Sequence, residues 1–259
     1  MTTAPFKTVT YEKTGRVAHV ILNRPGVINA FDIQMRDDLS EVLYAIRHDD
    51  DVAVVLLRGA GERGFCAGAD LSEFGSAPSQ GAARRARWER DVFGALRDHP
   101  IPTVAALHGH VIGSGVELAL LCDIRIAADN AIFSMPETYY GLIAAAGGTQ
   151  TLPRAVRQGR ALDMLLTGRR LNAAEALRAG VVQRVVPAGD LLVEAGRIVS
   201  GLVALDRSLF AAVKAALEAA RDLPLVDGLA RERRLSIMLS RGVGTPQPAS
   251  VNGSPIEYI

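Results

Sequence analysis

The chain has 259 residues, 49% of them hydrophobic, and carries 29 basic and 28 acidic residues for a net charge of +1. That length and apolar content suffice for one large core, with or without a smaller appendage. The balanced charge argues against a nucleic-acid-binding protein, which usually carries a basic excess or stripe.

Three further features narrow the class of protein. The two cysteines, Cys66 and Cys122, make neither a disulfide framework nor a metal site. The basic clusters at residues 84–87 and 231–234 sit among acids on helical patterns, which is typical of solvated helix faces. No signal peptide and no apolar run of ~18 residues is evident, so we expect a soluble cytoplasmic protein without a membrane partner.

Two strands and a helix are predicted at the start of the chain. Residues 6–22 indicate a strand pair turning near Thr14 and Gly15, and its second strand is apolar on both faces. Asp32 is a predicted N-cap, followed by apolar residues at helical spacing up to His48. Residues 52–57 predict a buried strand. This order favours parallel strands joined by a right-handed crossover.

A glycine-rich loop follows the strand at residues 59–64. Its letters fit GxGxxG, the pattern of a dinucleotide site. In such a site the loop runs straight into a helix whose start holds the pyrophosphate. Here the loop continues through residues 65–70 instead, so we reject that interpretation.

Residues 75–98 contain a second loop and a helix. Gly, Ser and Pro predict a loop over residues 75–81, and residues 82–98 predict a helix with an apolar side of Trp88, Val92, Phe93 and Leu96. A core or subunit contact is favoured for Trp88 over a contact with substrate.

The central stretch, residues 103–150, carries the candidate chemistry. Two isolated acids, Glu117 and Glu137, lie among apolar and small residues, and burial raises the pKa of a carboxyl group toward the range useful for general acid–base catalysis. Glycines 113 and 115 open the helix that carries Glu117, where unpaired backbone N–H groups would stabilise a developing oxyanion. A paired structural role for both acids is the alternative.

A serine nucleophile at Ser114 was also considered. A GxSxG elbow requires glycines at positions 112 and 116, which hold Ile112 and Val116. We therefore reject a serine hydrolase.

The remainder of the chain is predicted to be mainly helical. Helices are expected at residues 147–168, 173–179 (capped by Asn172 and ended by Gly180), 191–205, 208–221 and 226–240, with a short strand at 181–186. The tail from Arg241 is rich in Gly, Pro and Ser and is expected to be loosely held. We predict a core at residues 1–195, a helical subdomain at 196–240 and a tail at 241–259.

Several ordered motifs resemble the enoyl-CoA hydratase/isomerase (crotonase) family. They are residues 65–71, residues 108–109 with 113–119, residues 122–127, and residues 136–137 with 147–150. The resemblance extends over residues 6–240. It implies an α/β fold, a crotonase-type ββα spiral core followed by a helical C-terminal subdomain that forms a homotrimer or a homohexamer (dimer of trimers).

The resemblance also implies site residues. The backbone N–H groups of Ala69 and Ser114 would form an oxyanion hole, with Ser114 standing where many relatives have glycine. Glu117 and Glu137 would be the catalytic acids. Contacts with coenzyme A or substrate are implied for Arg24, Cys66, Ala67, Gly68, Asp70, Leu71, Gly113, Tyr140, Phe210 and Lys214. For Arg24 the alternative is an ordinary turn arginine.

The resulting hypothesis is an enoyl-CoA hydratase that acts on an acyl-CoA thioester without a metal or redox cofactor. A Δ3–Δ2 enoyl-CoA isomerase, or another acyl-CoA lyase or hydrolase on the same fold, is the first alternative. A non-catalytic acyl-CoA- or RNA-binding protein is the second. Residues 142–146 stand where many hydratases have a Pro-Gly pair, so the sequence does not define which acyl group is preferred.

Overall fold

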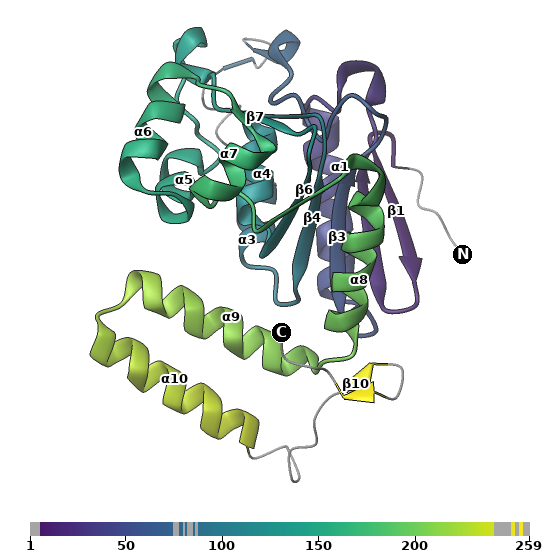
Figure 1. Ribbon diagram of the computed structural model, residues 1–259, viewed down its shortest axis with the longest axis vertical. Coiled ribbons are helices and arrows are strands. Elements are labelled where there is room, and N and C mark those ends of the chain that lie inside the picture. The colour runs from purple at the N-terminus through teal and green to yellow at the C-terminus, as the bar shows by residue number, and fades with distance from the viewer. Residues whose placement is uncertain are drawn as a thin grey trace.

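The computed structural model describes residues 6–74, 78–79, 81, 85, 88–240, 250–251 and 254–255. A six-stranded sheet in the order β1-β2-β3-β4-β6-β9 runs through the centre of the molecule (Figure 1). Its strands are β1 (Val9–Thr14), β2 (Val17–Leu22), β3 (Val54–Gly59), β4 (Thr103–Leu107), β6 (Ile124–Ala128) and β9 (Arg184–Val186). β1 and β2 pair antiparallel, and every later neighbour in this sheet pairs parallel.

Alternate side chains of the sheet bury on opposite faces, as the two-residue period of a strand requires. In β3, Val55 and Leu57 belong to a large core cluster with α1 (Ile33–Arg47), α3 (Val92–Arg97) and α4 (Ser114–Leu121). Val54 and Leu56 point the other way, into a smaller cluster with α8 (Leu191–Val203). Helices therefore cover both faces of the sheet, as expected for parallel strands.

A second, three-stranded sheet lies next to the α4 helix (Figure 1). It consists of β5 (His110–Ile112), β7 (Ile132–Ser134) and β8 (Leu171–Asn172). Three helices, α5 (Gly148–Ala155), α6 (Gln158–Thr167) and α7 (Ala173–Ala179), follow in the same part of the molecule. The short 3₁₀ helices are η1 (Pro25–Val27), η2 (Leu71–Glu73), η3 (Glu137–Tyr140) and η4 (Ala188–Asp190).

Two long helices, α9 (Arg207–Asp222) and α10 (Leu225–Ser240), pair with each other below the core (Figure 1). Polar contacts tie α9 to the core: Lys214 Nζ lies 2.9 Å from Asp123 Oδ2, and the Arg207 guanidinium donates to backbone carbonyls of Asp49 and Val52. β10 (Ser250–Val251) and β11 (Ser254–Pro255) form a small antiparallel pair beyond them. Most of the predicted tail lies outside the described residues.

Several local predictions are confirmed. β1 and β2 turn at Thr14 to Val17. The Asp32 side chain accepts a hydrogen bond of 2.7 Å from the Met35 backbone N–H and caps α1. Asn172 and Glu175 form a reciprocal capping box at the start of α7, and Gly180 ends that helix with φ +91°.

One prediction of an element is wrong. The single helix expected over residues 147–168 is two helices, because Val156 (φ −121°, ψ 166°) and Arg157 (φ −62°, ψ 143°) are extended. Pro153, which cannot donate a backbone hydrogen bond, lies in the last turns of α5. Trp88 is 80% exposed, so of its two favoured roles the core is excluded and the subunit contact stays a prediction.

The helix expected over residues 82–98 falls partly on residues that the structure does not describe. The described α3 begins only at Val92, where the Asp91 side chain caps it through the Gly94 N–H at 2.9 Å. The loop predicted over residues 75–81 is likewise described only at residues 78, 79 and 81. The proposed domain boundary at residue 195 falls inside α8, which packs on the central sheet.

Candidate active site

Glu117 lies in the first turn of α4 and is only 2% exposed. Its Oε1 accepts hydrogen bonds from the backbone N–H groups of Ala146, at 3.0 Å, and Gly148, at 2.8 Å. Burial of a carboxylate is costly unless hydrogen bonds replace its water. The two backbone donors offset that cost and fix the orientation of the carboxylate toward the start of α5.

Glu137 opens η3, directly after Pro136. Burial raises the pKa of its carboxyl group, and the negative charge of Glu117 raises it further. Its Oε2 is buried and has no hydrogen-bond partner among the described residues. An unsatisfied buried oxygen calls for an explanation, and a site that receives a water molecule or a ligand supplies one. Glu137 therefore keeps its proton to a higher pH than an ordinary glutamate.

Two glycines provide space for these carboxyl groups. A Cβ atom added at Gly113, whose φ is +51°, would lie 2.6 Å from Glu137 Oε1. A Cβ atom added at Gly148 would lie 3.0 Å from Glu117 Oε1 and 2.6 Å from the Met135 Cε. Any side chain at either position would displace a neighbour of the site.

The loop before η2 presents the backbone of Ala69. Phe31 N–H donates to Gly68 O at 2.8 Å, and Asp70 N–H donates to Phe31 O at 2.9 Å, so Phe31 and Ala69 form a parallel β-bridge. In such a bridge the N–H group of Ala69 points away from the partner strand. Among the described residues it has no acceptor, and the same holds for the N–H group of Ser114 at the start of α4.

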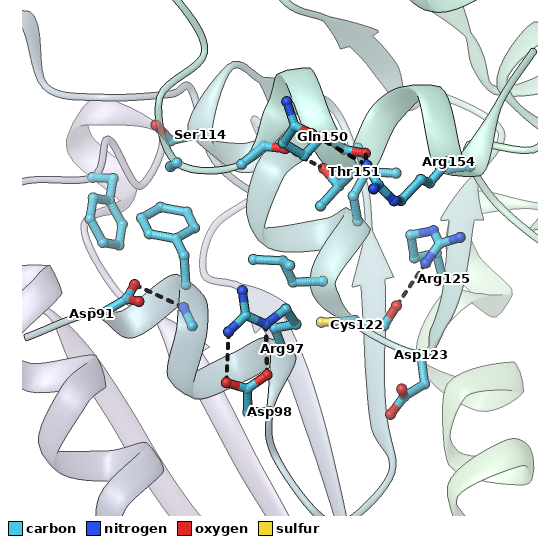
Figure 2. Close-up of a pocket in the computed structure, with 18 of the residues that line it drawn as sticks. Asp91, Arg97, Asp98, Ser114, Cys122, Asp123, Arg125, Gln150, Thr151 and Arg154 are labelled. Carbon is cyan, nitrogen blue, oxygen red and sulfur yellow. Dashed lines mark hydrogen bonds and ion pairs between the residues drawn. The ribbon is translucent and has the colours of Figure 1, made fainter. Parts of the chain in front are cut away.

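Ala69 and Ser114 line the same large cavity, together with residues 145–147. The cavity has a volume of about 1970 Å³ and continues between the core and α9. Figure 2 shows Ser114 at its upper end and Asp98 and Asp123 lower down. A drug-sized ligand fills roughly 300–1,000 Å³, so this cavity has room for a longer ligand.

The predicted contact residues in the loop at residues 66–71 differ in how exposed they are. Cys66 is fully buried, burial raises the pKa of its thiol to about 12, and its backbone N–H and carbonyl groups are bonded to His110 and Ile112. Gly68 is buried with φ +100°, and its Cα lies close to Gly113. Asp70 lines the cavity, Ala67 is half-buried and Leu71 is exposed.

Three predicted contact residues are less closely associated with this end of the cavity. A second, smaller cavity of about 440 Å³ is lined by Glu137 and Leu142. Tyr140 is 58% exposed at the end of η3 and lines neither cavity. Phe210 and Lys214 line the distant part of the cavity from α9. The Lys214 ammonium is already paired with Asp123 and with the Ile101 carbonyl.

The Arg24 side chain faces carboxylates rather than open solvent. Its Nη1 donates to Asp70 Oδ2 at 2.9 Å and to Ala30 O at 2.6 Å, and its Nη2 lies 3.2 Å from Asp32 Oδ2. Arg24 is not among the residues that line the cavity.

Sequence reasoning missed the backbone donors to Glu117. Ala146 and Gly148 lie 29 and 31 residues away from that acid along the chain. The only signal was the glycine pair at positions 147 and 148, because a backbone that must approach another group closely favours glycine.

The described residues offer no group of three or more His, Cys, Asp or Glu side chains arranged to hold a metal ion. Within the same residues, no helix combines the length and apolar content needed to cross a membrane.

The site combines the buried Glu117, the half-buried Glu137 and two outward-facing backbone N–H groups at Ala69 and Ser114. Together with a mostly parallel sheet and a helical C-terminal end, these features define a class of protein. The chain belongs to the enoyl-CoA hydratase/isomerase family, whose model matches residues 12–240. The expected crotonase fold is confirmed: an enoyl-CoA hydratase subunit from Geobacillus kaustophilus superimposes with a TM-score of 0.86 at 33% identity, over 92% of each chain.

Curated relatives cover most of the chain as well. A probable enoyl-CoA hydratase, echA8, from Mycobacterium tuberculosis is 37% identical over 233 residues, which are 89% of this chain and 88% of that protein. An (E)-benzylidenesuccinyl-CoA hydratase from Thauera aromatica is 38% identical over 223 residues, 85% of this chain and 86% of its own.

Proposed function

We propose that the protein is an enoyl-CoA hydratase, which adds water across the 2,3 double bond of an enoyl-CoA thioester to give a 3-hydroxyacyl-CoA. The observation that carries the proposal is the pair of unlike carboxyl groups. Glu117 is held by two backbone N–H groups, whereas Glu137 is half-buried, has a raised pKa, and has a buried oxygen, Oε2, without a hydrogen-bond partner in the described part of the chain. Membership of the family and the names of the relatives support the same activity.

The reaction follows from these roles. Glu117 accepts a proton from water as the water oxygen bonds to C3 of the substrate. The electron pair of the double bond moves toward C2 and the thioester oxygen. Glu137 then donates its proton to C2, and the carbonyl group re-forms. Glu117 gains one proton and Glu137 loses one, so the total charge of the pair does not change. Transfer of a proton from Glu117 to Glu137 then restores the starting state.

The developing negative charge on the thioester oxygen requires donors. We assign this role to the backbone N–H groups of Ala69 and Ser114, which lack acceptors in the described part of the chain and line one cavity. A backbone donor does not depend on the side chain, so serine at position 114 is compatible with the role. Each donor of this kind typically contributes about 10²–10³ in rate.

Hydration is favoured over double-bond isomerisation because both acids are present. Moving a double bond from the 3,4 to the 2,3 position transfers one proton between carbons of the substrate, and a single base can carry it. Holding and splitting a water molecule makes use of a second carboxyl group. The identity of the acyl group is left open by this proposal. The relative from Thauera aromatica is named for a substrate with an aromatic acyl group.

The proposal extends to partners and cofactors. The substrate is an acyl-CoA, no metal or redox cofactor is required, and the protein is expected in the cytoplasm. We propose a homotrimer or a dimer of trimers, because α10 has no buried residue and leaves Leu225, Val226 and Met238 more than 70% exposed. Light scattering of the purified protein tests the assembly.

Incubation with crotonyl-CoA in H₂¹⁸O tests the activity. A hydratase gives 3-hydroxybutyryl-CoA that carries ¹⁸O on C3, detectable by mass spectrometry. A protein that only isomerises converts a 3-enoyl-CoA into a 2-enoyl-CoA without ¹⁸O in its product. Binding of the thioester without any product would instead indicate a non-catalytic protein and contradict the proposal.

A further inference from the structure

The segment at residues 28–31 runs beside the loop that presents Ala69. Three backbone hydrogen bonds join them: Ala67 N–H to Ile28 O at 2.9 Å, Phe31 N–H to Gly68 O at 2.8 Å and Asp70 N–H to Phe31 O at 2.9 Å. The orientation of the Ala69 N–H group therefore depends on where residues 28–31 lie.

Residues 28–31 hold an uncommon backbone conformation. Ile28 and Asn29 both have positive φ, 53° and 55°. For residues other than glycine this conformation is costly, so the surroundings must hold it in place. The Asn29 side chain is fully buried, and its Nδ2 lies within 3.1 Å of the carbonyl oxygens of Ala60, Gly64 and Phe65. Its Oδ1 accepts the Arg24 backbone N–H at 2.9 Å.

Arg24 contacts both residues 28–31 and the neighbouring loop that presents Ala69. One guanidinium nitrogen, Nη1, donates to Ala30 O on one segment and to the Asp70 carboxylate on the other, next to Ala69. The other, Nη2, pairs with Asp32, whose second oxygen caps α1. The planar guanidinium fixes such geometry in a way that a lysine ammonium does not.

The charges around Arg24 do not suit a phosphate group. Asp32, Asp70 and Glu73 line the cavity on this side together with Arg36, whose guanidinium is already paired with Asp37. The three carboxylates outnumber the Arg24 guanidinium, which faces Asp32 and Asp70. The Arg24 side chain is 23% exposed, with Asp70 at 16% and Asp32 at 13%. A phosphate approaching Arg24 would meet carboxylates with a net negative charge.

We infer that Arg24 is a positioning residue for the Ala69 oxyanion donor, acting through Asp70 and the segment that Asn29 anchors, and is not a contact for coenzyme A phosphates. The inference rests on the proposed hydratase function. It assigns to the ion pair between Arg24 and Asp70 a share in transition-state stabilisation, because a small misplacement of a donor already lowers the rate.

Two substrates separate positioning from phosphate binding. Crotonyl-CoA carries the phosphates, whereas crotonyl-pantetheine carries the same thioester without them. For Arg24→Gln we expect kcat to fall about tenfold to a hundredfold on both substrates, with little change in KM. A rise in KM confined to crotonyl-CoA, with kcat kept, would overturn the inference.

Control variants distinguish a specific effect of the ion pair between Arg24 and Asp70 from a general loss of structure. Arg63→Gln is the matched control, because Arg63 donates only to the carbonyls of Pro25 and Gly26 and has no carboxylate partner among the described residues. It should keep the wild-type kcat. Asp70→Asn should lower kcat like Arg24→Gln, and the double variant should be no worse than either one. Fully multiplicative effects of the two changes would contradict coupling through this ion pair.

Hydrogen exchange supplies a readout that does not need activity. In Arg24→Gln, the Asp70 N–H group, bonded to Phe31 O, should exchange at least about tenfold faster than in the wild type. Unchanged exchange would overturn the positioning role even if kcat fell. An inactive wild type would instead contradict the proposed hydratase activity. The exchange result would still show whether Arg24 holds the loop that presents Ala69 in place.

Discussion

The carboxylate of Glu117 accepts a hydrogen bond of 2.8 Å from the backbone N–H group of Gly148, so the acid on α4 is oriented by the first residue of α5. The two helices meet at a point where only glycine fits: an added Cβ would lie 2.6 Å from Met135 Cε and 2.8 Å from the Ala144 Cβ. Packing between α4 and α5 and the chemistry of the site therefore depend on the same contact.

Gly148→Ala is predicted to lower kcat with crotonyl-CoA by at least about tenfold, because the new methyl group would press on Met135, Ala144 and the Glu117 carboxylate and displace the backbone donor from that carboxylate. Steady-state kinetics measure the effect. Gly159→Ala is the matched control: Gly159 lies in α6, and an added Cβ meets no atom within 4 Å. The control should keep its activity. Equal activity of both variants with the wild type would show that the Gly148 contact does not orient Glu117.

The pH dependence of activity should follow Glu137. Its carboxyl pKa is raised above 4.5, first by burial and then by the charge of Glu117. The proposed step needs the protonated form, so activity should persist as the pH rises and decline once the pH passes this raised pKa. A profile of kcat against pH measures the alkaline limb. In Glu137→Gln the residual activity should lack that limb, while Glu41→Gln, on an exposed part of α1, should keep it. An identical limb in all three proteins would contradict the assignment.

Stability at acidic pH should depend on His99. The ring is 1% exposed, and burial, together with the positive charge of Lys214, lowers its pKa from 6.5 to about 4. The unfolded chain therefore binds this proton more tightly, and the free energy of unfolding should fall as the pH drops from 6.5 toward 4, by up to about 3 kcal/mol.

Urea unfolding at pH 7.5 and at pH 4.5 measures this loss. The His99→Gln variant should lose less stability than the wild type between the two values, because its side chain does not titrate. His48→Gln, at the exposed end of α1, should behave like the wild type. Equal losses in wild type and His99→Gln would rule out His99 as the source.

Local patterns in the sequence predicted most elements and the burial of Glu117 well. The N-cap of Asp32 and the capping box of Asn172 depend on neighbours three residues away, and such contacts are visible in a pattern. The apolar residues around Glu117 correctly indicated its burial. The sequence did not predict the extended conformation at Val156, because the apolar periodicity continues across the two-residue break between α5 and α6.

The contacts that orient the site could not be predicted in the same way. Gly148 reaches Glu117 across 31 residues, and Arg24 reaches Asp70 across 46. Such pairs depend on how the loop at residues 142–147 and the segment at residues 28–31 pack in three dimensions. A sequence pattern shows that the residue types are present but not which of them meet. For Arg24, the pattern alone left a phosphate contact and a turn arginine equally open.

The loss of enoyl-thioester absorbance with crotonyl-CoA, measured for the wild type beside Glu117→Gln and Glu137→Gln, tests the central claim most directly. The paired roles of the two acids predict rapid loss with the wild type and a drop of about 10² or more in kcat for each variant. Each variant should still bind the thioester, because neither change removes a backbone donor. A wild type that binds crotonyl-CoA without consuming it, or a variant that keeps full activity, would contradict hydration by this pair of carboxyl groups.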